Sequence, residues 1–283
     1  MMIPVIIIRT VWKHQRKAII MKTAFIGCGN MASAIIGGIL SSSLSKPEDL
    51  MASDSSPAAQ DRIRNVLKIS CVSNEQAASL ADVLFLSVKP QFYEEVIAQI
   101  KDFVRPDTII VTIAPGKTLS WLREQFGREL KIVRTMPNTP AMVKEGMTGV
   151  CRNESVTDED LAKVMSILES FGKAEVVPEH LLDVVTSVSG SSPAYVFMLI
   201  EAMADGAVAD GMPRAQAYKF AAQAVLGSAK MVLETGRHPG ELKDMVCSPG
   251  GTTMEAVRVL EEKGLRSAII EAEKACVSKS RGM

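Results

Sequence analysis

The chain has 283 residues, enough for about two domains, and its composition (47% hydrophobic, 5% aromatic) predicts an aliphatic, alanine-rich core. Because 32 basic and 32 acidic residues balance without a long block of one sign, neither nucleic acid nor an anionic membrane is expected as the main partner. Five cysteines without a C-x-x-C pair and only three histidines predict reduced, mostly buried thiols, a cytoplasmic location and no metal site.

Residues 1–20 do not share the alternating pattern of the residues after Met21. The apolar run Val5–Ile8 is too short to span a bilayer, which takes about 20 residues. Most basic residues of this stretch come after that run, the reverse of a secretory signal. We therefore expect an extension outside the fold, with Met21 as the natural start, rather than a targeting segment.

From Met21 to about Pro178, short β-rich runs alternate with helical patterns, which is typical of a doubly wound parallel sheet in an α/β domain. Strands are predicted at Lys22–Ile26, Leu50–Ser53, Ile69–Val72, Val83–Val88, Thr108–Ile113 and Ile132–Met136. Helices are predicted at Asn30–Leu40, Pro57–Leu67, Phe92–Ile100, Leu119–Gln125 and Asp158–Ser170, the last with Thr157 as its N-cap.

Residues 179–283 have a different character, because the β-rich runs vanish and long helices rich in alanine, methionine and leucine take over. One helix is predicted to begin with Ser192 as N-cap and Pro193 at its first position. Another is predicted to run from Pro213 to about Glu234 and to end at Gly236. Two or three such helices cannot bury their apolar faces alone, so we expect a second subunit to cover them.

A glycine motif, Gly27-x-Gly29-x-x-Ala32, follows the first predicted strand and opens the first predicted helix. This context is the one that a dinucleotide-binding turn requires. Gly27 would permit the tight turn, Gly29 would let a pyrophosphate approach the backbone, and Ala32 would let the helix pack closely on its strand. The amides of the first helical turn would hold the phosphates. The alternative is a glycine turn that binds nothing.

Asp54 lies just beyond the second predicted strand. An acidic residue at this place usually accepts hydrogen bonds from the adenosine ribose hydroxyls and so favours NAD, whereas an arginine favours the 2′-phosphate of NADP. An aspartate in a serine-rich loop that starts the next helix explains the residue equally well. Both interpretations stay open.

Further candidates follow the next strands and meet at the carboxyl edge of the sheet, where such folds bind ligands. Lys89 in Ser87-Val88-Lys89-Pro90 is either a catalytic ammonium or an exposed lysine at a strand end. Asn138 and Thr139 are either contacts for ribose and nicotinamide or residues that make a turn.

Near the other end of the chain, Ser248-Pro249-Gly250-Gly251 leads into Thr252-x-x-Glu255, the pattern of a capping box before a helix. The two glycines leave amides uncovered ahead of the helix N-terminus, which is a site suited to a carboxylate. Thr253 would stand in the first turn with its hydroxyl directed at the bound group. An ordinary capped helix is the alternative.

Taken together, these motifs resemble the pyrroline-5-carboxylate reductase family from Met21 to about Arg281. The segments that carry the resemblance are Phe25–Ala32, Val88–Pro90, Met136–Pro140, Ser189–Tyr195, and Leu242–Asp244 leading into Ser248–Thr253. The resemblance implies a Rossmann NAD(P)-binding domain over residues 21–178, followed by an all-α dimerisation and substrate domain over residues 179–283. It also implies homodimers, often assembled into decamers, with the active site at the dimer interface.

The implied reaction is the NADPH-dependent reduction of the cyclic imine 1-pyrroline-5-carboxylate to L-proline, the last step of proline biosynthesis, with NADH as an alternative cofactor. The resemblance places the cofactor along Ile26, Gly27, Cys28, Gly29, Asn30, Met31, Asn74, Ser87, Val88, Lys89 and Pro90. It places the substrate carboxylate on Ser248, Gly250, Gly251 and Thr252, and gives Thr253 the bond to the ring nitrogen.

Three features depart from the family pattern. Pro115 stands where alanine is common, Asp54 puts the preference for NADPH in question, and residues 1–20 have no counterpart. From the residues alone, two rivals stay open. One is a β-hydroxyacid dehydrogenase with Lys89 as its base. The other is a non-catalytic NAD(P)-sensing module, against which the intact segment Ser248–Thr253 argues.

Overall fold

The computed structural model describes residues 21–282, so the prediction that residues 1–20 lie outside the fold concerns a segment outside the described range. The chain divides into two compact units. Within residues 21–282, the first holds the residues up to Thr135 together with Pro140–Val176, and the second holds Met136–Thr139 and the residues from Val177 onward. That residues 21–178 and 179–283 are separate domains stays a prediction.

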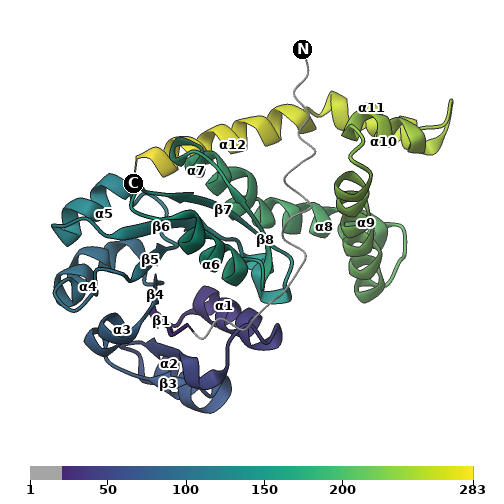
Figure 1. Ribbon diagram of the computed structural model, residues 1–283. Helices are drawn as coiled ribbons and strands as arrows, with labels where there is room; N and C mark the ends of the chain where they lie inside the picture. The colour runs from purple at the N-terminus through teal and green to yellow at the C-terminus, as the bar shows by residue number, and fades with distance from the viewer. Residues whose placement is uncertain (1–20, 283) are drawn as a thin grey trace. The chain divides into compact units, whose positions relative to one another are not determined.

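The first unit is built on an eight-stranded sheet in the order β3-β2-β1-β4-β5-β6-β7-β8 (Figure 1). The pairs β1–β2, β1–β4, β2–β3, β4–β5, β5–β6 and β7–β8 are parallel. The first six strands therefore have the order of a dinucleotide-binding fold, and the predicted fold class is confirmed. The strands are β1 (Thr23–Ile26), β2 (Leu50–Ser53), β3 (Ser70–Cys71), β4 (Val83–Leu86), β5 (Ile109–Thr112), β6 (Lys131–Met136), β7 (Gly146–Arg152) and β8 (Gly172–Val176).

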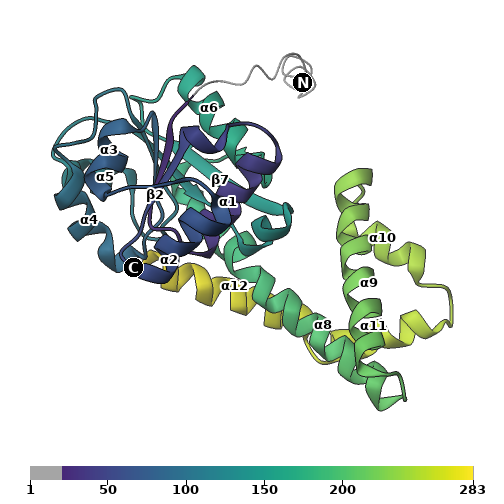
Figure 2. The same cartoon turned by 90° about the horizontal axis from the view of Figure 1, so that it is seen from below.

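Helices cover both faces of the sheet, and alternate residues of the buried strands point to opposite faces. Phe25 and Phe85 stack with ring centroids 4.8 Å apart, in the core layer that contains α1 (Asn30–Ser41) and α6 (Asp158–Leu168). Ile26 and Leu86 belong to the opposite layer, with α3 (Asn74–Leu80), α4 (Tyr93–Ile100) and α5 (Leu119–Phe126). Figure 2 shows α3, α4 and α5 grouped together.

Most predicted elements of the first unit are present, with two kinds of difference. The helix predicted at Pro57–Leu67 is α2 (Pro57–Asp61) continued by a π-helical turn, Arg62–Leu67, which ends where Lys68 takes a left-handed conformation with φ 55°. The elements α3, β7 and β8 were not predicted. The predicted N-cap of α6 is confirmed, because Thr157 and Asp160 form a complete capping box.

The second unit is helical, as predicted. Its helices are α7 (Leu182–Val185), a π-helical turn (Thr186–Ser191), α8 (Ser192–Ala209), α9 (Arg214–Thr235), α10 (Pro239–Val246), α11 (Thr252–Glu262) and α12 (Leu265–Arg281). Ser192 is not an N-cap. The helical run begins before it, and its hydroxyl donates to Val188 O at 2.6 Å. Gly236 ends α9 in the left-handed conformation, φ 65°, as predicted.

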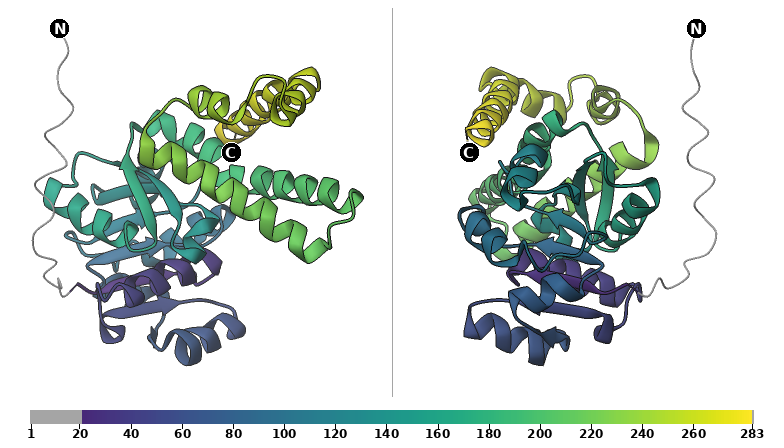
Figure 3. Two further views of the ribbon diagram at one scale, coloured as in Figure 1. Left: turned by 90° about the vertical axis from the view of Figure 1, so that its right-hand side faces the viewer. Right: turned by 60° about the vertical axis from the view of Figure 1, so that its left-hand side comes forward.

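Buried polar contacts hold the second unit together where apolar burial is scarce. The hydroxyl of Ser187 donates to Glu273 O at 3.0 Å, and that of Ser280 donates to Asp183 Oδ1 at 2.7 Å, so α12 is tied to α7 and the π-helical turn. In the segment Met136–Thr139, Asn138 Nδ2 donates to Ser189 O at 3.0 Å. Figure 3 shows α8 and α9 side by side, and the two helices are in contact.

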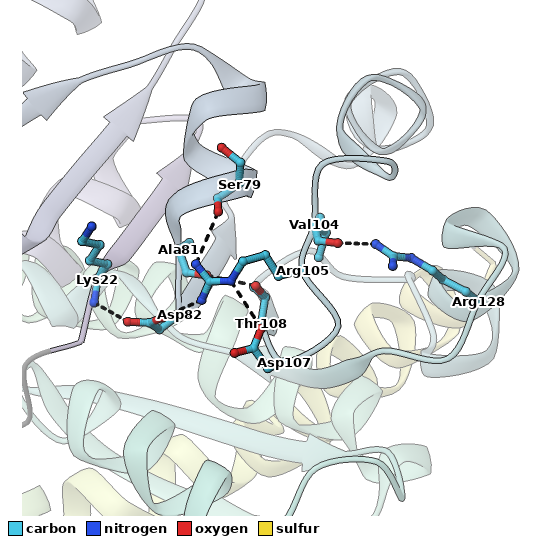
Figure 4. A network of polar contacts seen from close by, with 9 residues as sticks. All are labelled: Lys22, Ser79, Ala81, Asp82, Val104, Arg105, Asp107, Thr108 and Arg128. Atoms are coloured by element: carbon cyan, nitrogen blue, oxygen red, sulfur yellow. Dashed lines mark hydrogen bonds and ion pairs between the residues drawn. The ribbon is translucent and has the colours of Figure 1, made fainter.

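Ionic contacts fix the amino edge of the sheet, where β1, β4 and β5 begin (Figure 4). Asp82 accepts a hydrogen bond from Lys22 N at 2.9 Å and one from the Arg105 guanidinium at 2.6 Å. Arg105 also reaches Asp107 at 3.3 Å, and Thr108 Oγ1 donates to Ala81 O at 2.9 Å. These contacts hold the starts of three neighbouring strands level.

Tyr93 fixes the opposite, carboxyl edge. Its side chain is fully buried, and its hydroxyl donates to Leu86 O at 2.7 Å and lies 2.8 Å from Thr112 Oγ1. Burial raises the pKa of Tyr93 well above its usual value, so the hydroxyl is neutral and available as a donor. The contact joins the last residues of β4 and β5, from which the loops at this edge start.

Replacing Tyr93 by phenylalanine should destabilise the protein, because it leaves the carbonyl of Leu86 and the hydroxyl of Thr112 buried without this partner. The expected loss is about 1–3 kcal/mol in the free energy of unfolding, measured by urea titration. The matched control is Tyr218→Phe, which removes the same hydroxyl from a side chain that is 40% exposed and should cost little. Equal stability of Tyr93→Phe and the parent chain would contradict this role.

Candidate active site

The glycine turn after β1 is shaped by a close approach of two backbones. Gly27 has φ 88°, and a Cβ on it would lie 2.8 Å from the backbone of Ser87 and Val88. Its amide donates to Ser53 O at 2.8 Å. Only glycine fits here without strain, so the tight turn predicted at Gly27 is confirmed. Gly29, in contrast, has φ −75° and open space where a Cβ would stand.

The side chains of the turn divide into buried and accessible ones. Ile26 and Cys28 are almost completely buried, so their backbones, not their side chains, are what a ligand can reach. Gly29 and Asn30 are exposed and Met31 is half-buried at the start of α1. Gly29 is the N-cap of the 12-residue helix α1 and offers no side-chain cap, so no cap side chain occupies the first-turn amides.

Asp54 lies beside the glycine turn and is held there. Its Oδ2 accepts from Cys28 N at 2.7 Å, and its Oδ1 accepts from Ser56 N at 2.8 Å. Arg62 donates from its guanidinium to Cys28 O, on the other side of the same residue. Burial raises the pKa of the Cys28 thiol above its usual value, and Asp54 adds to that effect, while Ser33 and Arg62 oppose it.

The segment after β4 completes this edge. Ser87 N donates to Ile26 O at 2.8 Å, and Ser87 Oγ is buried without a hydrogen-bond partner. Val88 is half-buried and Lys89 is exposed as the residue before a short 3₁₀ turn, Pro90–Phe92. This placement agrees with an exposed lysine at a strand end.

Asn74 is the first residue of α3, close to the end of β2. Its Oδ1 accepts from Ser53 Oγ at 2.5 Å, and its Nδ2 donates to Gln99 Oε1 at 2.8 Å. The ends of β1, β2 and β4 and the starts of α1 and α3 therefore meet at one edge. The orphaned hydroxyl of Ser87 and the lack of room for a Cβ at Gly27 fit a dinucleotide laid across that edge.

Sequence reasoning missed the contact of Arg62 with the glycine turn, because it assigned this residue to the following helix and gave it no role. The structure does place Arg62 on that helix, at the start of the π-helical turn, yet its side chain reaches back to Cys28. Asn138 was considered for ribose or nicotinamide, but it is buried and bonded to Ser189 O. Turn and packing roles therefore explain Asn138.

In the second unit, the loop before α11 has the turn that its glycines suggest. Gly250 has φ 68°, Gly251 N donates to Ser248 O at 3.0 Å, and a Cβ on Gly251 would lie 2.3 Å from Ser248 Oγ. The predicted capping box is wrong. Thr252 is already the first helical residue and Gly251 is the N-cap, so the threonine stands one position too late to cap. Glu255 instead accepts from Arg258 at 2.7 Å.

Thr253 stands in the first turn of α11, as predicted. It is half-buried, while Ser248, Gly250 and Thr252 are exposed. The N–H groups at the start of a helix have no partner within it. Because the cap is a glycine, no side chain covers them. The loop thus presents backbone donors and two threonine hydroxyls, without a titratable side chain between Ser248 and Thr253.

All five cysteines are free thiols. Cys28 and Cys151 are buried, but Cys71, Cys247 and Cys276 are partly exposed, so the prediction of mostly buried thiols is wrong for three of the five. Within residues 21–282, no group of three or more His, Cys, Asp or Glu side chains could hold a metal ion. In the same range, no helix is long and apolar enough to cross a membrane.

Two family models match the chain. Residues 22–116 match the model described as NADP oxidoreductase coenzyme F420-dependent, and residues 179–283 match the model described as pyrroline-5-carboxylate reductase dimerisation. A pyrroline-5-carboxylate reductase of Escherichia coli is 55% identical over 260 residues, which cover 92% of this chain and 97% of that protein.

Solved structures agree with this result. A pyrroline-5-carboxylate reductase from Coxiella burnetii has a TM-score of 0.86 at 33% identity, covering 93% of this chain and 98% of its own. A pyrroline carboxylate reductase from Plasmodium falciparum with NADP bound has a TM-score of 0.85 at 32% identity, covering 93% and 97%. On identity and coverage of this extent, the chain belongs to the pyrroline-5-carboxylate reductase family.

Proposed function

We propose that this chain reduces 1-pyrroline-5-carboxylate to L-proline with NADPH, or with NADH, in the last step of proline biosynthesis. The observation that carries this proposal is 55% identity to a reductase of that name over nearly the whole chain. The rival of a β-hydroxyacid dehydrogenase needs Lys89 as a base, and this lysine lies exposed at a strand end. The rival of a sensing module would need no carboxylate-binding loop at Ser248–Thr253.

For the cofactor, we propose the edge formed by the glycine turn, Asn74 and the segment after β4. When bound, the nicotinamide supplies the hydride. The backbone of Gly27–Asn30 would approach the pyrophosphate at the N-terminus of α1. Ser87 would use its unpartnered hydroxyl, and Val88, Lys89 and Pro90 would border the cofactor through their backbone.

For the substrate, we propose the loop Ser248–Thr253. The amide of Thr252, at the positive end of the 11-residue helix α11, would bind the carboxylate, while Gly251 N is bonded to Ser248 O and shapes the loop. Gly250 provides the left-handed turn that leads into this helix start. The hydroxyl of Thr253 would bond the ring nitrogen and orient the ring.

This site needs no strong buried acid. Reduction of a cyclic imine adds a hydride to the C=N carbon and a proton to the nitrogen, and the nitrogen is basic enough to take that proton readily. Thr253 would therefore hold the nitrogen in place and support the amine as it forms. The remaining rate enhancement would come from holding the two reactants in a reactive geometry.

We also propose a homodimer, with a decamer as a further assembly, in the cytoplasm. Among residues 179–282 the buried hydrophobic side chains are Leu182, Ala204, Ala217, Ala221 and Leu242. Large apolar side chains of α8 and α9 are exposed instead, among them Phe197 at 63%, Met198 at 68% and Leu233 at 84%. Exposure on this scale marks an interaction surface. Residues 179–283 would thus form the dimerisation and substrate domain and residues 21–178 the cofactor domain.

The reaction is tested with the purified protein, 1-pyrroline-5-carboxylate and NADPH or NADH, by the nicotinamide absorbance and by assay of proline. We expect one molecule of proline to form for each molecule of cofactor that is oxidised. Gly29→Ala serves as the matched variant, because its Cβ meets no protein atom but stands where a pyrophosphate approaches. It should fold normally and bind NADPH weakly. Cofactor binding without proline formation would favour the sensing module instead.

Thr253→Ala should lower kcat by about 10–100-fold, the worth of ~1.4–2.7 kcal/mol for one hydrogen bond to a partly charged group. The effect should fall on kcat because the ring nitrogen changes its bonding as the hydride arrives. The dissociation constant of NADPH should not change. Thr253→Ser keeps the hydroxyl and should recover much of the rate. Normal turnover of Thr253→Ala, with only a loss of stability, would show that this residue helps to start α11 and has no part in the reaction.

Introducing a charge on the apolar face of α9 should prevent assembly and activity together. Leu226 is 55% exposed and Ala224 is also exposed, so Leu226→Glu or Ala224→Glu changes the outer surface and leaves the buried Ala221 in place. An unpaired charge in an interface opposes its closure. The mass is measured by analytical ultracentrifugation. Val66→Glu, at a 70% exposed apolar residue of the first unit, is the control. A fully active monomer would contradict the proposal.

A further inference from the structure

We propose that Asp54 and Arg62 hold the backbone of Cys28 from both sides, and so position the glycine turn for the pyrophosphate of the cofactor. We call this pair the Cys28 clamp. The inference rests on the proposed NAD(P)H-dependent function, and it assigns Asp54 to positioning in place of the choice between NADH and NADPH.

The clamp is visible in three hydrogen bonds. Asp54 Oδ2 accepts from Cys28 N at 2.7 Å, and the Arg62 guanidinium donates to Cys28 O. The carboxylate of Asp54 thus binds the N–H of Cys28, and the guanidinium of Arg62 binds its carbonyl. Such charge-assisted hydrogen bonds are stronger than those between neutral groups. Asp54 is itself fixed, because its Oδ1 accepts from Ser56 N at 2.8 Å.

Cys28 is where such a clamp has most effect, since it stands between two glycines. Gly27 is fixed by its contact with Ser87, but Gly29 has no protein atom within 4 Å of the position of a Cβ. Glycine loses more conformational freedom than any other residue when it is ordered. A clamp at Cys28 orders the turn before the cofactor arrives, and preorganisation of this kind increases affinity.

Arg62 reaches the turn from an unusual backbone. It opens the π-helical turn Arg62–Leu67, and single π-helical turns are frequent at functional sites. Its Nε is buried without a hydrogen-bond partner, while its terminal nitrogen Nη2 donates to Cys28 O. A buried N–H without an acceptor is costly, so packing alone does not account for this placement.

The position of Asp54 argues against a primary role in selecting the cofactor. Both carboxylate oxygens of Asp54 already accept hydrogen bonds from backbone N–H groups. The positively charged Arg62 also binds Cys28, one of the two residues that Asp54 binds. If Asp54 contacted the adenosine ribose, replacing Asp54 would change the ratio of the affinities for NADPH and NADH. If it holds the turn, its loss should weaken both cofactors by the same factor.

The test measures cofactor binding without substrate, by nicotinamide fluorescence, for Asp54→Asn, Arg62→Met and the double variant. Each single change should raise Kd about tenfold for NADPH and equally for NADH, the worth of one charge-assisted hydrogen bond. In the double variant, Kd should rise by less than the product of the two single increases, because both residues act on the backbone of Cys28. Arg62→Lys keeps a cationic donor and should recover part of the affinity.

A second measurement, hydrogen exchange of residues 27–31 in the cofactor-free protein, reports the turn itself. Exchange at Cys28 N should quicken in Asp54→Asn, while Arg64→Met, which changes an exposed arginine of the same π-helical turn, should alter neither exchange nor Kd. Arg62→Gln replaces Arg62→Met if the latter fails to fold.

A changed NADPH-to-NADH ratio with unchanged exchange would overturn the clamp in favour of ribose recognition. Equal behaviour of the Arg62 and Arg64 variants would also overturn it. Because these measurements need no imine, failure of the clamp is distinguishable from failure of the proposed reaction.

Discussion

The contact between Gly27 and the backbone of Ser87 is the constraint on which the first unit depends. The two backbones lie so close that a Cβ on Gly27 would stand 2.8 Å from Ser87 C and O. Gly27 N is bonded to Ser53 O, and Ser87 N to Ile26 O, so the carboxyl ends of β2 and β4 are both bonded to the end of β1 at Ile26 and Gly27. The start of α1, the loop of Asp54 and the hydroxyl of Ser87 all take their positions from this convergence.

The two units reach stability by different means. The first buries two complete apolar layers against its sheet, and polar contacts at both edges, around Asp82 and around Tyr93, keep the strands level. The second buries few large side chains and relies on polar contacts such as Ser187 to Glu273 and Ser280 to Asp183. Because large apolar side chains contribute most of the hydrophobic free energy, its helices need a partner surface in a way that the sheet does not.

Sequence periodicity predicted those elements whose signal is local. Val83–Leu86 and Ile109–Thr112 are strands that are buried along their whole length, and Gly236 ends α9 as its type suggests. Strands β7 and β8 were missed because they begin with Gly146 and Gly172, and β8 is mostly exposed, so neither shows a clear apolar pattern.

For the candidate site, the tight turn at Gly27 and the start of a helix after Gly251 were predicted from their motifs, whereas the bond of Arg62 to Cys28 was not. It joins residues 34 positions apart. It also depends on a π-helical turn, which no sequence pattern predicts.

The helices of this fold differ in whether a side chain caps their first-turn donors. Helices α3, α5 and α6 are capped by Ser73, Thr118 and Thr157, and each of these side chains accepts from one first-turn amide. Helices α1 and α11 begin instead with Gly29 and Gly251, both in extended conformation and without a side-chain cap.

A serine or threonine cap would stabilise α1 and α11 by only roughly a few tenths of a kcal/mol relative to glycine, but it would occupy an amide that an anion could use. The pyrophosphate of the cofactor and the carboxylate of the substrate are both anions. Under the proposed function, glycine at these two caps leaves both helix starts open to anions at little cost in local stability, and binding of the ligands would supply the missing hydrogen bonds.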